Sequence, residues 1–155
     1  MTDRSDMFSA LLENVRLIVA NDSGSSEKLQ VICQMLTDGV QHYDWVGFYL
    51  TDQAGRNLVL GPFVGEPTDH VQIPFGRGIC GQAAQRRETF LVQDVSKEAN
   101  YLSCSPRVRS EIVVPVIRKG EVLGELDIDS HQLSPFAKED SEFLERVAAL
   151  VSRLF

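Results

Sequence analysis

The alternation of side chains between Glu121 and Ser130 constrains the fold of this chain more than any other feature of its sequence. Successive side chains of a β-strand point to opposite faces, so one face of this segment is apolar and the other is acidic. The preceding segment, Ser110 to Ile117, is apolar and rich in β-branched residues, and Lys119-Gly120 can form a tight turn. The sequence therefore predicts an antiparallel hairpin with an apolar row, Val122, Gly124, Leu126 and Ile128, and an acidic row, Glu125, Asp127 and Asp129.

The acidic row gains a fourth carboxylate if the turn is tight, because Glu111 in the first strand then arrives beside the far end of the second. Carboxylates within a few ångströms of one another cannot all ionise freely without a counter-charge. We therefore expect a cationic ligand or a shared proton at this position. A carboxylic acid kept neutral by its neighbours can also donate a proton, and Glu111 is the candidate for that role.

The length and the net charge of the chain favour a single domain and disfavour two classes of partner. Its 155 residues suffice for one hydrophobic core, and we expect one domain over residues 1–155. With 15 basic and 22 acidic residues, the net charge of -7 disfavours nucleic acid and anionic membranes as partners. No segment is apolar for long enough to cross a bilayer, and the N-terminus lacks the apolar core of a signal peptide, so we expect a cytoplasmic protein.

Helical and strand patterns follow one another in an order typical of an α+β domain. Apolar residues recur at helical spacing from Ser5 to Asn21, from Leu29 to Val40, and in a last helix opened by Ser134-Pro135. Strand patterns lie between them, and residues 45–50 and 57–63 form a first hairpin. The expected fold is an antiparallel sheet with the N- and C-terminal helices packed on one face and a ligand pocket on the other.

The three cysteines have different surroundings, and their odd number argues against a framework of structural disulfides. Cys33 lies in an apolar helical stripe, as a small buried hydrophobe does. Cys80 lies in a glycine-rich turn that matches G-x-G-x-x-G, but the antiparallel pattern around it argues against a dinucleotide fold. This turn places Cys80 near a helix N-terminus, where backbone amides favour a thiolate.

Cys104 has the surroundings of a reactive thiol. It lies in a polar loop without apolar periodicity, and Arg107 and Arg109 follow closely. Nearby cations lower the pKa of an exposed thiol, which makes it a better nucleophile. A surface cysteine without a chemical role has the same pattern, so the two interpretations stand side by side.

Two other features also have more than one interpretation. Trp45 and Tyr49 share one face of a strand, where they are either core residues or the aromatic wall of a pocket. A divalent metal held by the acidic row and His70 is a weaker hypothesis, because the histidines are scattered and no recognised ligand spacing appears. We therefore expect no metal.

Five pieces of the chain resemble the free methionine-(R)-sulfoxide reductases, which are GAF domains. These are WVGFYL, LVLGPFVG, IPFGRGICGQAA, the Cys104 loop running into SEIVVP, and GELDIDS. The resemblance implies that Cys104 attacks the sulfoxide sulfur of free methionine sulfoxide without a bound cofactor. A second cysteine then resolves the sulfenic acid, and thioredoxin reduces the resulting disulfide. The implied substrate-binding residues are Trp45, Tyr49, Glu111, Asp127 and Asp129.

The chain departs from this family at two places. The family usually has a cysteine a few residues before its IP-x-GRG segment, where this chain has Thr68, Asp69 and His70. Cys80 is then the candidate to resolve the sulfenic acid of Cys104, unless a small thiol reduces Cys104 directly. The second departure is Glu125, which stands where the family commonly carries an apolar residue.

A non-catalytic GAF module that binds or senses a small molecule is the alternative function. The missing cysteine favours it, whereas a sensor is usually accompanied by an output domain, which we do not expect in this chain. A homodimer formed through the apolar first and last helices is compatible with the resemblance, and so is a monomer that buries the same stripes.

Overall fold

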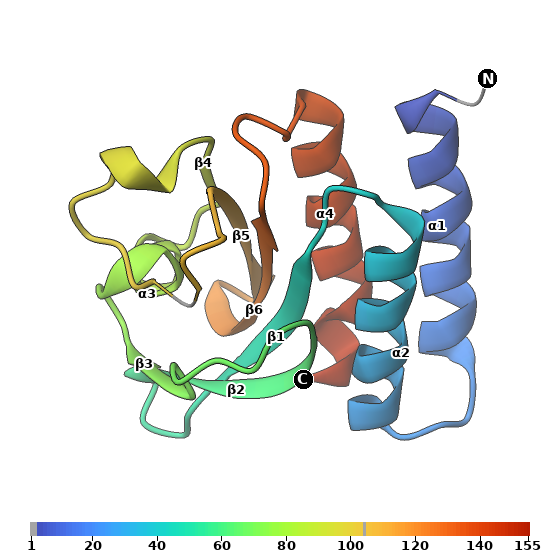
Figure 1. Ribbon diagram of the computed structural model, residues 1–155. Coiled ribbons are helices and arrows are strands. Elements are labelled where there is room, and N and C mark those ends of the chain that lie inside the picture. The colour runs from blue at the N-terminus through green and yellow to red at the C-terminus, as the bar shows by residue number, and fades with distance from the viewer. Residues whose placement is uncertain (1–2, 104) are drawn as a thin grey trace.

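The computed structural model describes residues 3–103 and 105–155 (Figure 1). Cys104, the predicted nucleophile, lies outside the described residues. The described chain folds around one antiparallel sheet with the strand order β3-β2-β1-β6-β5-β4. The strands are β1 (Trp45–Thr51), β2 (Asn57–Val64), β3 (Gln72–Pro74), β4 (Phe90–Val92), β5 (Ser110–Arg118) and β6 (Glu121–Ser130).

Helices cover both faces of the sheet. The helices are α1 (Arg4–Ala20), α2 (Ser25–Gly39), α3 (Gly78–Arg86) and α4 (Lys138–Val151), with short 3-10 turns at Val95–Lys97 and Ser152–Leu154. Figure 1 shows α1, α2 and α4 as one layer beside the sheet, whereas α3 and the loops around it lie on the other side. The predicted α+β fold, with terminal helices on one face, is therefore confirmed. Within the described residues, no helix combines the length and the apolar character needed to cross a membrane.

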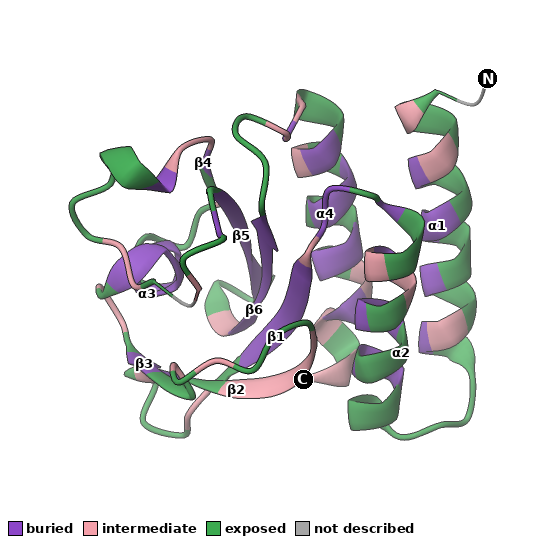
Figure 2. Cartoon of the chain, in the orientation of Figure 1, coloured by how far each residue is buried: buried purple, intermediate pink, exposed green. Residues whose placement is uncertain are grey.

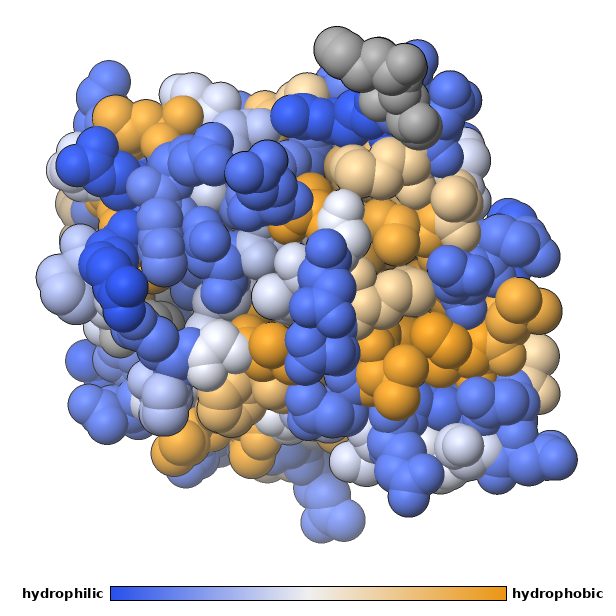
Figure 3. Space-filling model, turned by 45° about the vertical axis from the view of Figure 1, so that its right-hand side comes forward, coloured by the Kyte–Doolittle hydropathy of each residue, from blue (hydrophilic) through white to orange (hydrophobic). Residues whose placement is uncertain are grey.

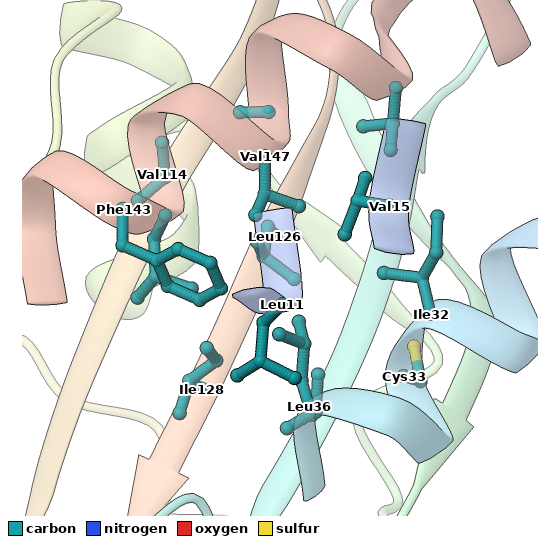
Figure 4. Close-up of a cluster of buried hydrophobic side chains, with 14 of the residues drawn as sticks. Leu11, Val15, Ile32, Cys33, Leu36, Val114, Leu126, Ile128, Phe143 and Val147 are labelled. Atoms are coloured by element: carbon teal, nitrogen blue, oxygen red, sulfur yellow. The ribbon is translucent and has the colours of Figure 1, made fainter. Parts of the chain in front are cut away.

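The larger hydrophobic core fills the space between the helical layer and the sheet. Leu126 and Ile128 of β6 are fully buried against Val15 of α1, Leu36 of α2 and Val147 of α4 (Figure 4). Cys33 is part of this core, as predicted for a small buried hydrophobe. Figure 2 shows that burial runs along the facing sides of these helices and along the central strands. The apolar row of β6 is thus held by three helices from distant parts of the chain.

One member of the predicted apolar row lies on the opposite face. The pairing of β5 with β6 is irregular between Val116 and Ile117, which lie opposite Gly124 and Val122. Two residues of β6 therefore advance against one of β5, and such a bulge shifts the alternation of side chains. As a result Val122 packs against the cluster on the α3 side, while Leu123 packs against the helical core. The prediction for Val122 was wrong because strand alternation assumes an unbroken ladder.

The start of the last helix was also predicted too early. Ser134 has a φ of 51°, which is incompatible with a right-handed helix, and α4 begins only at Lys138. Between them Phe136 is buried against the helical core. The connection from β6 to α4 is therefore longer than the Ser-Pro signal indicated, because the chain first turns to bury an aromatic side chain.

The tight turn between β5 and β6 is confirmed. Lys119 and Gly120 both have positive φ, 52° and 80°, as a two-residue hairpin turn requires. The resulting register places Glu111 directly opposite Asp129, and β1 continues the sheet by placing Trp45 opposite Asp129 on its other side. Three strands thus bring the predicted site residues onto one face of the sheet.

Candidate active site

The acidic row is buried beneath α3. The exposed fractions are 0% for Glu125, 2% for Asp127, 3% for Asp129 and 5% for Glu111. Acidic side chains almost never reach such burial in a protein unless a partner compensates their charge. The ion pairs of the described residues do not involve Glu125, Asp127 or Asp129. Their burial therefore indicates either protonation or a cationic ligand.

Burial raises the pKa of each of these three acids. The pKa of Glu125 and that of Asp129 are both well above their ordinary values, because of burial first and the charge of Asp127 second. The pKa of Asp127 is raised by burial and lowered in part by hydrogen bonds with Glu111 and Cys80. The expectation of a shared proton is thus supported, since the first carboxylate to ionise makes the next ionisation harder.

Cys80 lies directly over these acids. It is the third residue of α3, and its Sγ lies 3.3 Å from Asp127 Oδ2 and 3.8 Å from Glu111 Oε2. The thiol is buried, and its pKa is well above the ordinary value because of burial and the charges of Asp127 and Glu111. The prediction that the helix N-terminus favours a thiolate at Cys80 was therefore wrong. The helix N-terminus carries about half a positive elementary charge, which lowers the pKa of a thiol. Burial and the nearby carboxylates raise the pKa of Cys80 by more than that charge lowers it.

The predicted site residues line two small cavities. Tyr49, Cys80, Glu111 and Asp127 line one of about 10 Å³, together with Leu102. A second cavity of about 30 Å³ is lined by Trp45 and Asp129, together with Ser105 and four other described residues. Leu102 and Ser105 come shortly before and after position 104, so the described parts of this loop border both cavities.

A larger hollow exists elsewhere, and its described lining contains none of the predicted site residues. It has a volume of about 640 Å³ and is bordered by the β1–β2 turn, the end of α3 and the start of β6. The described residues of its walls include no acidic row and no thiol. Size alone therefore does not identify the site in this fold, whereas the gathering of buried titratable groups does.

Both interpretations of the two aromatic residues hold in part. Tyr49 is buried at 1% exposure and borders the first cavity, and its hydroxyl donates a hydrogen bond to His70 O at 2.9 Å. Trp45 borders the second cavity, stacks on Phe63, and donates from Nε1 to Glu66 O at 2.9 Å. Each ring is therefore packed like a core residue while its polar end fixes the loop between β2 and β3 beside the acids.

Two residues that hold the surrounding loops gave no signal in the sequence. Asn100 accepts a hydrogen bond from Gly78 N at 2.8 Å and donates to Gly76 O at 2.9 Å, and so fixes the glycine turn before Cys80. Glu66 forms an ion pair with Arg107, one of the cations predicted to act on Cys104. A single Asn or Glu in a polar loop has no periodicity, so only the tertiary contacts reveal these roles.

Comparison with known proteins identifies the family of this chain. The model of the GAF domain matches residues 26–154. The free methionine-R-sulfoxide reductase of Saccharomyces cerevisiae is 43% identical over 71% of this chain, which spans 62% of that protein. The free methionine-R-sulfoxide reductase of Escherichia coli is 30% identical, and the match covers 98% of this chain and 90% of the Escherichia coli protein.

Solved structures agree with the sequence relatives. The free methionine-R-sulfoxide reductase of Neisseria meningitidis, in complex with its substrate, superposes with a TM-score of 0.93 at 35% identity, covering 100% of this chain and 92% of that one. The type II enzyme from Thermoplasma acidophilum has a TM-score of 0.79 at 40% identity and covers 93% of this chain and 94% of its own. The structural similarity therefore extends over nearly the whole chain.

Proposed function

This chain belongs to the GAF-domain family, among the free methionine-R-sulfoxide reductases, and from that premise we propose that it reduces free methionine-(R)-sulfoxide to methionine with Cys104 as the nucleophile. The observation that carries the proposal is the burial of Glu111, Asp127 and Asp129 on one sheet face, bordered by the loop on both sides of position 104. The ammonium group of a free amino acid can supply a cation to Asp127 and Asp129, which form no ion pair among the described residues.

The substrate's ammonium group would counteract the burial that raises the pKa values of Asp127 and Asp129. A buried carboxylate regains its charge when a cation binds beside it, and charge-assisted hydrogen bonds are about twice as strong as neutral ones. Asp127 and Asp129 are raised above their ordinary pKa values, so they are poised to ionise when the ammonium arrives. Trp45 and Tyr49 then enclose the apolar part of the substrate.

The chemistry requires one nucleophile and one proton donor. In the proposed reaction, the Cys104 thiolate attacks the sulfoxide sulfur while a carboxylic acid protonates the sulfoxide oxygen. The oxygen is transferred to the cysteine, so methionine leaves and Cys104 becomes a sulfenic acid. Glu111 is the proposed proton donor, since it lies opposite Asp129 and close to Asp127, where carboxyl groups share protons.

The sulfenic acid must then be reduced, and Cys80 is the proposed resolving thiol. Its attack forms a disulfide with Cys104 and releases water, and two electrons from an external thiol, thioredoxin or a small thiol, restore both cysteines. The raised pKa of the Cys80 thiol makes it a poor nucleophile by itself. Asp127 Oδ2, 3.3 Å from the Cys80 Sγ, is placed to accept its proton during this step.

Substitution of each cysteine tests the proposal. The Cys104→Ser variant should lose reduction of free methionine-(R)-sulfoxide with any reductant, whereas Cys33→Ser should keep it, because Cys33 lies in the helical core. The Cys80→Ser variant should lose turnover with thioredoxin but keep part of it with dithiothreitol. Both sulfoxide isomers are assayed with both reductants. Unchanged turnover by the Cys104→Ser variant refutes the assignment.

Thiol counting separates the enzyme from the alternative, a GAF module that only binds its ligand. A stoichiometric amount of methionine sulfoxide added to the reduced protein, without external reductant, oxidises two cysteines of an enzyme with a resolving thiol. A pure binder retains all three of its thiols. Circular dichroism of each variant shows whether the fold is kept.

The partner and the compartment are also proposed. Figure 3 shows hydrophobic side chains gathered on the side of the molecule that carries α1 and α2. Leu17 of α1 is 63% exposed, and Val31 of α2 is 51% exposed. We assign this surface to a homodimer, and Leu17→Ser should shift the protein towards the monomer in sedimentation velocity.

The cytoplasm is the proposed location, because Cys33 and Cys80 are free thiols and a reducing compartment keeps them so.

A further inference from the structure

Three buried groups at the site have the chemistry of a metal site. The Cys80 Sγ, a Glu111 carboxylate oxygen and an Asp127 carboxylate oxygen all lie within 4.8 Å of one another. We propose that these three residues bind a thiophilic divalent metal ion of the zinc class, and that the ion inhibits the enzyme by occupying the acids that receive the substrate. The ion is an inhibitor in this proposal and takes no part in catalysis.

The distances between the ligand atoms fit a tetrahedral ion. Zinc binds thiolate sulfur at about 2.3 Å and carboxylate oxygen at about 2.0 Å, which places sulfur and oxygen about 3.5 Å apart at a tetrahedral angle. The measured separations from Cys80 Sγ, 3.3 Å to Asp127 and 3.8 Å to Glu111, lie on either side of this value. Both separations from the Cys80 Sγ thus differ from the tetrahedral value by only a few tenths of an ångström, and all three ligand atoms lie within 4.8 Å of one another.

A second observation is independent of these distances. Asp127 Oδ1 is buried and has no hydrogen-bond partner within the described part of the chain, although Asp127 borders the first cavity. Both carboxylate oxygens of Glu125, the next acid in the row, are also buried without a hydrogen-bond partner among the described residues. Buried acceptors without partners are costly, and a cation in the cavity relieves that cost.

The size of the cavity also suits an ion. Its volume of about 10 Å³ is close to the smallest space that holds one water molecule. Methionine sulfoxide has many more atoms and enters only if the covering side chains move apart. A metal ion is therefore the ligand that this closed arrangement accommodates with least rearrangement.

The mixture of ligands decides the class of metal. Thiolate is a soft ligand that favours zinc and its neighbours, whereas magnesium and calcium prefer sites made of oxygen alone. Binding releases the thiol proton of Cys80, and the three ligands then carry one more negative charge than the ion carries positive charge. The burial of Cys80, Glu111 and Asp127, each at most 5% exposed, shields the site from competing water.

The inhibitory effect depends on the proposed function, whereas binding does not. Glu111 and Asp127 are the acids assigned to the substrate, so metal and substrate exclude each other. In single turnovers of the reduced protein, which end before Cys80 is needed, zinc should raise the methionine sulfoxide concentration for half-maximal methionine formation without changing the maximal rate, and a chelator should restore the original value. A fall in the maximal rate at an unchanged half-saturating concentration overturns competition at these acids.

Binding is measured with cobalt(II) and the reduced, anaerobic protein in the absence of substrate. A cobalt ion bound to a thiolate gives a charge-transfer absorption in the near ultraviolet, which reports the sulfur ligand directly. The wild type, Cys33→Ser and Cys104→Ser should all develop this absorption, whereas Cys80→Ser should not. Absence of the absorption in the wild type, or its survival in Cys80→Ser, overturns the proposal.

Asp127→Asn provides a second variant that keeps the thiol and the shape of the side chain. It should weaken cobalt binding by at least about tenfold, since even the loss of an outer partner of a metal ligand costs about that much. Unchanged affinity removes Asp127 from the site. If the wild type reduces methionine sulfoxide but shows no cobalt charge-transfer absorption, only the metal site is refuted. If the wild type shows the absorption but has no reductase activity, only the proposed function is refuted.

Discussion

Replacement of Glu125 by methionine should stabilise the protein. Glu125 is 0% exposed, lies between Tyr49 and Pro115 of the flanking strands, and has two carboxylate oxygens without a hydrogen-bond partner among the described residues. Burying a polar group without a partner costs about 1–3 kcal/mol, and methionine has a similar length without that cost. We expect a gain of about 2 kcal/mol in the free energy of unfolding near neutral pH.

The gain should depend on pH in a defined direction. Burial and the charge of Asp127 raise the pKa of Glu125 well above 4.5, its ordinary value, so the folded protein holds a proton that the unfolded chain releases. Stability is then full below 4.5 and falls as the pH rises, by up to about 1.4 kcal/mol per pH unit for this group. The Glu125→Met variant lacks this loss, so its advantage over the wild type should grow as the pH rises above 4.5.

Urea unfolding followed by circular dichroism measures the effect at each pH. Glu125→Gln is the matched control, because it removes the titration but keeps a polar group, and its difference from Glu125→Met should be constant with pH. Glu121→Met, at the exposed start of the same strand, should change stability by less than about 0.5 kcal/mol. In a scan, the stabilised variant should melt about 4–8 °C higher. A destabilised Glu125→Met variant, or a gain that does not vary with pH, refutes the account of Glu125 as an unpartnered buried acid.

Two further predictions concern stability. Asp140 is fully buried and accepts hydrogen bonds from Arg4, His42 and Tyr43. The Asp140→Asn variant should therefore lose about 2–4 kcal/mol in the free energy of unfolding. The control Glu142→Gln, in the exposed part of α4, should not lose stability. Burial raises the pKa of Asp140 but its hydrogen bonds lower it below 3.8, so this stabilisation should be present above that pH and disappear below it. A Cβ at Gly124 would lie 2.2 Å from a backbone oxygen of β1, so Gly124→Ala should lose at least about 1–3 kcal/mol in the free energy of unfolding. A Cβ at Gly24 meets no atom within 4 Å, so the control Gly24→Ala should not lose stability in this way. Equal melting temperatures of the two alanine variants would contradict the close approach at Gly124.

The acidic site shows how far local patterns reach. The alternation in β6 and the Lys119-Gly120 turn placed Glu111, Asp127 and Asp129 on one face, and the register confirms that Glu111 lies opposite Asp129. The roles of these residues in binding and catalysis stay predictions. The state of Cys80 was not predictable, because its pKa depends on acids that follow it by 31 and 47 positions along the chain.

The sequence by itself determined the α+β class, the two hairpins and the acidic row, since each depends on the periodicity of neighbouring residues. Only the tertiary structure decided the strand order β3-β2-β1-β6-β5-β4, the bulge that turns Val122 to the other face, and the complete burial of the acids under α3. These features arise from contacts between segments far apart in the chain. Burial sets the dielectric surroundings of each charged group, so the electrostatics of the site follow from the packed fold and cannot be read from the order of residues.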